Sequence, residues 1–99
     1  MAFAQVLEFE ASDVENIKDI EREWEAATEG ERTARRVVLC QDRDRPGHFF
    51  EFVFFDSYDS AMENSRLPKT AEYAEKMKEA SSGEPTFHNL DVIEDRALS

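Results

Sequence analysis

The sequence contains a single cysteine, Cys40, among its 99 residues. A lone cysteine cannot form an internal disulfide, so the chain is not a small disulfide-stapled secreted domain. No apolar run approaches the roughly 20 residues of a membrane-spanning helix, and residues 1–11 lack the basic start and long apolar core of a secretory signal. We therefore expect a cytoplasmic protein.

Basic residues are also scarce, because 12 Lys and Arg face 23 Asp and Glu, which gives a net charge of -11. This surface repels phosphate backbones and anionic lipid headgroups, which disfavours nucleic acids and membranes as partners. Hydrophobic residues make up 40% of the chain and recur in periodic blocks, unlike those of a disordered acidic tail. We expect one folded domain over residues 1–99.

Motifs for nucleotides and metals are missing. The chain has no GxGxxG, P-loop, GxSxG, CxxC or HExxH. The sequence therefore predicts no cofactor and no bound metal. Cys40 lies in a predicted strand, where a small buried hydrophobe is the more common role than a nucleophile.

The most informative stretch that is present is HFFEFVFFD, residues 48–56, which holds five phenylalanines. In a strand, Phe50, Phe52 and Phe54 point to one face. The other face receives Phe49, Val53 and Phe55. Both faces should therefore be buried, one under the chain's own helices. The chain is too short for a second covering layer, so we expect a partner subunit on the other face.

Periodicity predicts the elements before this strand. Residues 2–10 alternate as a strand, and Ser12 to Glu15 match a capping box that begins a helix. The apolar positions of this helix recur at three- and four-residue steps until Gly30 ends it. Residues 33–42 form a second strand, joined to the aromatic strand as a hairpin.

After the hairpin, a helical segment begins at Ser57 or Asp59. Pro68 disfavours helical geometry at Leu67, so the helix should break near residues 65–67 and restart at Pro68. A last strand covers residues 87–94. This order predicts an α+β, ferredoxin-like βαββαβ fold with a four-stranded antiparallel sheet and both helical segments on one face. Two such sheets facing each other would form a dimeric α+β barrel, hence a homodimer.

The stretch from Phe55 through Asn64, Ser65 and Pro68, together with the closing FHNLDV at residues 87–92, resembles a group of short, mostly uncharacterised actinobacterial proteins. These are members of the dimeric α+β barrel superfamily, similar to antibiotic biosynthesis monooxygenases. The resemblance implies a homodimer with an apolar cavity. The superfamily includes oxygenases that oxidise anthrones or quinols without metal or flavin, haem-degrading enzymes and polyketide cyclases. Haem degradation is disfavoured because the only tryptophan, Trp24, lies on the first helix and neither histidine lies on a predicted helix. No catalytic residue is carried over.

Glu51 is the main candidate functional residue because it interrupts the aromatic strand. A carboxylate there must be paired, solvated by a cavity, or shifted toward its neutral form. It shares a face with Phe49, Val53 and Phe55, which we expect to be the inter-subunit face. Pairing with Arg35 or Arg36 is a structural interpretation, and a general base beside an apolar ligand is the functional one.

Other polar residues interrupt the first and last strands, which are neighbours in this topology. Gln5, Asn89 and Asp91 are therefore predicted, with Phe49, Val53 and Phe55, to line a ligand cavity. Solvation at a sheet edge would equally explain Asp91. His48 is a second candidate base, since histidine titrates near neutrality, with a structural role as the alternative.

Two functions are consistent with these patterns. The first is a cofactor-independent monooxygenase acting on a small aromatic or polyketide-like substrate. The second is a non-catalytic dimeric module that binds a hydrophobic ligand or a protein partner. Fold alone does not choose between them.

Overall fold

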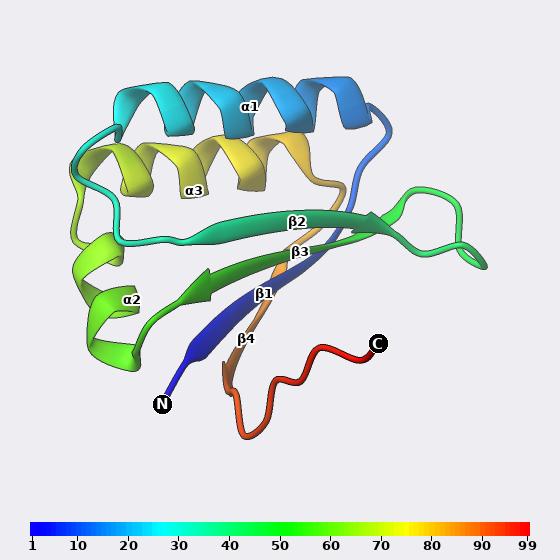
Figure 1. The fold of residues 1–99 in the computed structure, drawn as a ribbon. Helices are drawn as coiled ribbons and strands as arrows, with labels where there is room; N and C mark the ends of the chain where they lie inside the picture. Colours follow the sequence, from blue (N-terminus) through cyan, green and yellow to red (C-terminus); the bar gives the residue numbers. More distant parts are fainter.

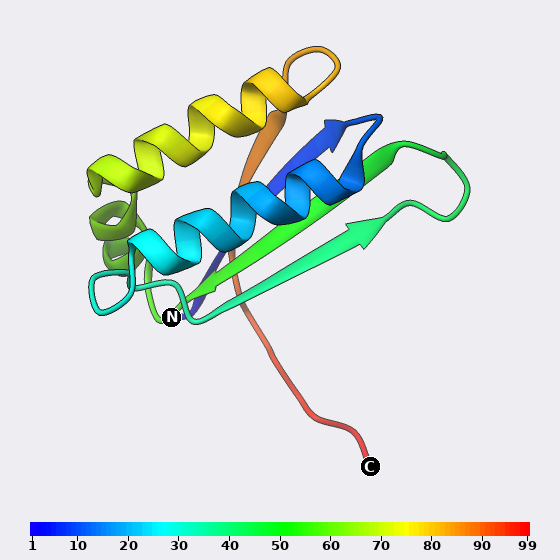
Figure 2. The same cartoon turned by 90° about the horizontal axis from the view of Figure 1, so that it is seen from above.

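The computed structural model describes residues 1–99 and contains four strands and three helices. In chain order these are β1 (Phe3–Glu10), α1 (Val14–Ala27), β2 (Arg36–Gln41), β3 (His48–Phe55), α2 (Tyr58–Ser65), α3 (Pro68–Ala80) and β4 (Thr86–Asp91). The strands form one antiparallel sheet in the order β2-β3-β1-β4. Helices α1 and α3 lie side by side over one face of the sheet (Figures 1 and 2). The predicted ferredoxin-like fold is confirmed.

The helix ends follow local side-chain chemistry. Asp13 caps α1, because its Oδ1 accepts hydrogen bonds from the backbone N–H groups of Glu15 at 3.1 Å and Asn16 at 3.2 Å. The predicted capping box at Ser12 was therefore wrong by one residue. At the other end, the Thr28 hydroxyl donates to the Trp24 carbonyl at 2.7 Å, so α1 ends before Gly30.

The break between α2 and α3 lies where the proline predicted it. Leu67 is extended, with ψ of 130°, and Pro68 opens α3 at a position where no amide hydrogen is needed. Ser57 caps α2 by accepting from the Ser60 N–H at 3.1 Å. The break turns α2 away from α3, which leaves the end of α2 beside the sheet (Figure 1).

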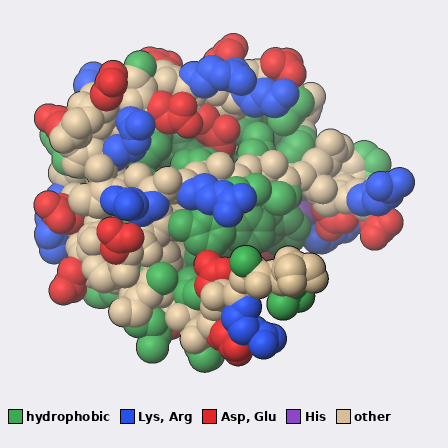
Figure 3. All heavy atoms as spheres, viewed as in Figure 1, with side chains coloured by type: hydrophobic (Ala, Val, Ile, Leu, Met, Phe, Trp, Pro, Cys, Tyr) green, Lys and Arg blue, Asp and Glu red, His purple; other side chains and the backbone are tan.

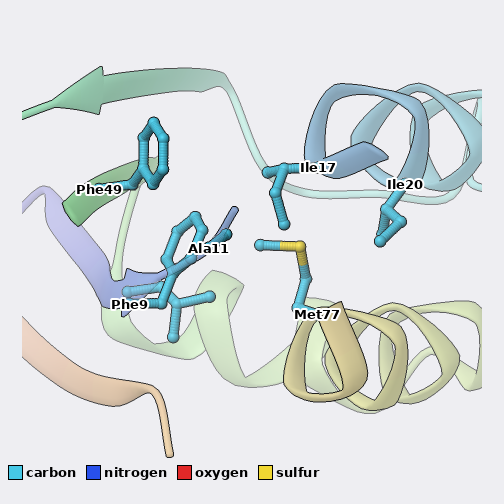
Figure 4. Packing of buried hydrophobic residues seen from close by; sticks show 7 residues of the cluster. Phe9, Ala11, Ile17, Ile20, Phe49 and Met77 are labelled. Carbon is cyan, nitrogen blue, oxygen red and sulfur yellow. The ribbon is translucent and has the colours of Figure 1, made fainter. Parts of the chain in front are cut away.

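The main hydrophobic core lies between the sheet and the two long helices. Phe9 and Phe49 stack at 5.6 Å between ring centroids, and Met77 reaches them from α3 opposite Ile17 and Ile20 of α1 (Figure 4). Ile17 and Met77 are almost completely buried. This cluster identifies the helix-covered face of the sheet as the one that carries Phe49.

That assignment corrects an expectation. Residues 49, 51, 53 and 55 face the helices, so the prediction that Phe49, Glu51, Val53 and Phe55 lie on an inter-subunit face was wrong. The alternation was correct, but Leu7 and Phe9, which pair with Glu51 and Phe49, are the residues that pack under the helices.

The opposite face of the sheet carries the remaining aromatic residues of β3. We call this the open face, and it includes Val38, Phe50, Phe52 and Phe54, all only partly buried. The rings of Phe52 and Phe54 stack at 6.4 Å. Hydrophobic side chains gather below the sheet, away from the helices, in Figure 3. Cys40, which pairs with Phe50 on this face, is exposed. Its predicted burial was wrong, because β2 is an edge strand and no helix covers this face of the sheet.

The chain ends beyond β4, which stops at Asp91 rather than at the predicted residue 94. The Val92 N–H donates to the Ala2 carbonyl at 2.9 Å, and the remaining residues run on the side of the sheet opposite the helices (Figure 1). None of the three helices combines the length and apolar character that a membrane span requires.

Candidate functional site

A pocket of about 210 Å³ lies between the helix-covered face of the sheet and helices α1 and α3. This is smaller than the ~300–1,000 Å³ of drug-sized sites, so it suits a small ligand. On α3, Ala71 and Ala74 line it with short side chains, which leave space below the helix. Its large apolar lining residues are Leu7, Trp24, Val37, Val53, Phe55 and Phe87.

The most buried polar group of the pocket is the carboxyl of Glu51, which is 2% exposed. The Tyr73 hydroxyl donates to it, with distances of 2.5 Å to Oε1 and 2.6 Å to Oε2. The predicted pairing with Arg35 or Arg36 was wrong. Arg36 pairs in register with Phe54 of the open face, and Arg35 Nε lies 3.8 Å from Asp56 Oδ1.

This environment favours the neutral form of Glu51. Burial raises its pKa well above the ordinary 4.5, and the nearby Glu21 carboxyl raises it further, while the Tyr73 hydrogen bond opposes the shift. Glu21 Oε2 is buried and has no hydrogen-bond partner. The Glu51 carboxyl therefore retains its proton above the usual carboxyl range.

Tyr73 remains a hydrogen-bond donor in this setting. Burial raises the pKa of its hydroxyl well above 10, and the neighbouring Glu51 carboxyl raises it further. Its ring also packs on Trp24, with centroids 5.6 Å apart. The Trp24 indole N–H donates to Thr70 Oγ1 at 3.0 Å, which joins α1 to α3 and fixes the indole at the pocket wall.

Asn64 provides a further buried polar group at the end of α2 and is 5% exposed. Its Oδ1 accepts the backbone N–H of Thr33 at 3.2 Å, so the amide NH₂ points away from that bond and is available to a ligand. The loop before β2 therefore holds this side chain in place.

The predicted site residues divide between the pocket and other places. Gln5, Val53 and Phe55 line the pocket with Glu51, and their part in ligand binding stays a prediction. Phe49 lies in the main core instead. Asn89 and Asp91 are exposed on the edge strand β4, although Asn89 Oδ1 accepts a hydrogen bond from Gln5 Nε2 at 3.4 Å.

His48 does not reach the pocket, because side chains alternate along β3 and His48 points to the open face, as Phe50 does. Its Nε2 lies 2.9 Å from Glu8 Oε2, and His88 Nε2 lies 3.2 Å from Glu8 Oε1. Hydrogen bonds from the two histidines lower the pKa of the Glu8 carboxyl. His48 cannot act as a base on a ligand in the pocket, so we withdraw it as a catalytic candidate.

Sequence reasoning missed Glu21, Trp24 and Thr70 as pocket residues. A signal for Glu21 was present, since it lies four residues after Ile17 and three before Trp24, on the buried side of α1. Tyr73 contributes to both the main core and the pocket.

No profile of a known protein family matches the chain, and no curated protein matches it at a significant level. Solved structures do match. A Caulobacter crescentus protein assigned to the antibiotic biosynthesis monooxygenases superposes with a TM-score of 0.77 at 14% identity, covering 94% of this chain and 91% of that one. SnoaB, a cofactor-independent oxygenase from Streptomyces nogalater, gives a TM-score of 0.77 at 12% identity, with 95% of each chain covered.

Rv0793 from Mycobacterium tuberculosis gives a TM-score of 0.75 at 15% identity, with 98% of this chain and 100% of that chain covered. Identities this low report the fold and leave the reaction open. The predicted resemblance is confirmed at the level of fold, and the actinobacterial subgroup stays a prediction. The chain has the α+β fold of the antibiotic biosynthesis monooxygenases.

Proposed function

We propose that the protein is a cofactor-independent oxygenase that oxidises a small aromatic substrate in the pocket between the sheet and helices α1 and α3. The observation that carries this proposal is the Glu51 carboxyl, almost fully buried in an apolar pocket and shifted toward its neutral form. A carboxyl with a raised pKa is a stronger base when ionised than a solvated one. The shared fold with SnoaB supports the same reaction class.

The reaction begins when the ionised carboxyl of Glu51 takes a proton from an activated C–H or phenolic O–H of the substrate. The resulting anion transfers one electron to O₂, and the substrate radical and superoxide combine to form a C–O bond. Loss of water from the hydroperoxide leaves a carbonyl. A CH₂ group thus becomes C=O, and O₂ supplies one oxygen atom to the product and one to water. The substrate provides all four electrons.

The surrounding residues have positioning roles in this proposal. Tyr73 holds the Glu51 carboxyl through its hydroxyl. The Asn64 amide NH₂ would donate to the oxygen on which negative charge develops, as preorganised donors do in other enzymes. The apolar lining excludes water and so favours electron transfer from the anion over its reprotonation.

Oxygen uptake with reduced anthrones and quinols, in EDTA, tests the proposal. Glu51→Gln should lower kcat by about 100-fold or more, because general bases contribute at least that much. His48→Ala is the matched control and should retain activity, since His48 lies on the other face of the sheet. Turnover that needs added metal or flavin, or a Glu51→Gln variant as active as the wild type, would contradict the proposal.

A non-catalytic ligand-binding module is the second candidate. It is favoured by one observation, that the Glu51 carboxyl already has a hydrogen-bond partner within the protein, the Tyr73 hydroxyl. Tight binding of aromatic compounds by calorimetry, with no oxygen uptake from any of them, would support this function over the first.

We also propose that the protein is a homodimer through the open face. Phe50, Phe52 and Phe54 form a partly exposed aromatic patch, and such patches often mark protein–protein interaction sites. Light scattering at micromolar concentration should give twice the chain mass. Phe52→Lys should give a monomer, because it would bury an unpaired charge, whereas Ala26→Lys on the outer side of α1 should not. A monomeric wild type would refute the homodimer.

A further inference from the structure

The charges of the pocket all have one sign. Glu21, Glu25 and Glu51 line it, and no Lys, Arg or His does. Arg32 approaches one wall, where its guanidinium lies 5.9 Å from the centre of the Trp24 ring and donates to the Glu25 carbonyl at 2.7 Å. Arg32 is exposed and is not part of the lining. The pocket therefore has no group that would neutralise an anionic ligand.

Its carboxyl oxygens also have few donors. The single Tyr73 hydroxyl serves both oxygens of Glu51, and the buried Oε2 of Glu21 has no hydrogen-bond partner. Buried polar atoms are nearly always hydrogen-bonded, because an unpaired one loses its hydration without compensation. A ligand with several N–H donors would satisfy these oxygens.

The apolar walls add a second preference. The rings of Trp24, Tyr73, Phe55 and Phe87 border the same space. Ring faces attract cations through their quadrupole, and they stack on aromatic ligands. The walls therefore suit an aromatic ring, and the carboxyl pair suits a positively charged donor attached to it.

We propose that the pocket selects aromatic amines, with the protonated amino group donating to Glu21 and Glu51 and the ring lying between Trp24 and Phe55, and that it rejects aromatic carboxylates. This inference rests on the proposed function for placing the substrate in this pocket, and it narrows that substrate to a phenol or quinol that carries an amino group.

A series of matched ligands tests the charge preference by calorimetry. Naphthylmethylamine, naphthalenemethanol and naphthoic acid share a ring and differ in the charge of one group. We expect the amine to bind about tenfold more tightly than the alcohol, as a charge-assisted hydrogen bond with ring contacts would give. The acid should bind more weakly still. The Trp24 indole N–H signal in NMR, the only one in the chain, should shift when the amine binds.

Variants connect the preference to particular carboxyls. Glu21→Gln should lower the affinity for the amine about tenfold and leave the alcohol unchanged, since only the amine gains from the charge. Glu21 is only partly buried, so this variant should fold even if Glu51→Gln does not. Glu31→Gln, on the exposed loop after α1, is the control and should change neither affinity.

The outcomes separate this inference from the proposed function. Equal binding of acid and amine, no binding by any of the three ligands, or an unchanged amine affinity in Glu21→Gln would overturn it. Amine binding without oxygen uptake from aminophenols would keep the inference and remove the oxygenase function. Oxygen uptake from uncharged quinols with no preference for amines would do the reverse.

Discussion

Replacing Glu51 with glutamine should change how the stability of the protein depends on pH. In the folded state the pKa of Glu51 lies well above its ordinary 4.5, chiefly because of burial. Between the unfolded and the folded pKa, the folded state therefore holds a proton that the unfolded chain has released. The contribution of this group to stability is fully present below the unfolded pKa and is lost as pH rises through the folded pKa. Each unit between the two pKa values amounts to about 1.4 kcal/mol.

The Glu51→Gln variant has no ionisable group at this position, so it avoids that loss. The new amide oxygen can still accept the Tyr73 hydroxyl, and the amide NH₂ can donate to the buried Oε2 of Glu21. At about pH 4, below the unfolded pKa, the two proteins should have similar free energies of unfolding. As pH rises above the unfolded pKa, the variant should become the more stable one, by about 1.4 kcal/mol for each pH unit until the folded pKa is reached.

Urea unfolding followed by circular dichroism, at one protein concentration and several pH values, measures this difference. Glu31→Gln is the control, since that side chain is exposed in the folded protein, and its difference from the wild type should stay flat. Parallel stability profiles for the wild type and Glu51→Gln would refute the reasoning, because they would mean that the carboxyl titrates alike in both states.

Three further substitutions have definite expectations. Met77→Ala should lower the free energy of unfolding by about 2–5 kcal/mol, because the side chain is 1% exposed in the main core, and a loss below about 1 kcal/mol in urea would contradict that packing. Glu8→Gln should reduce the loss of thermal stability on acidification. The lowered pKa of the Glu8 carboxyl stabilises the fold above the unfolded pKa, and this stabilisation is lost as pH falls through the folded pKa. An unchanged acid profile would contradict this expectation. Thr70→Val should shift the Trp24 indole signal in NMR and cost about 1 kcal/mol, and an unmoved signal would mean that the bond is absent in solution.

The fold was largely predictable because its signals are local. Alternation, helical periodicity and the proline at position 68 each depend on residues close together in the chain, and each element appeared near its expected place. Ser12 and Asp13 are both good caps, so composition could not choose between them.

The site was less predictable because it depends on which face the helices cover. Strand β3 is apolar on both faces, so alternation correctly grouped Glu51 with Val53 and could not assign the group to a side. Tyr73 and Glu21 reach Glu51 from separate helices, and only the packing of α1 against α3 brings them together. Arg36 lies on the neighbouring strand β2, but the strand register pairs it with Phe54, while Leu39 lies opposite Glu51.

Strand β3 also has a consequence for how the sequence can evolve. An ordinary strand at a protein surface alternates between constrained and freely varying positions. In β3, successive residues contribute in turn to the aromatic patch of the open face and to the helix-covered core or the pocket. Few of its eight positions are then free to drift. Change in this protein should accumulate instead on the outer sides of α1 and α3 and in the exposed loops, where substitutions disturb neither side of the sheet.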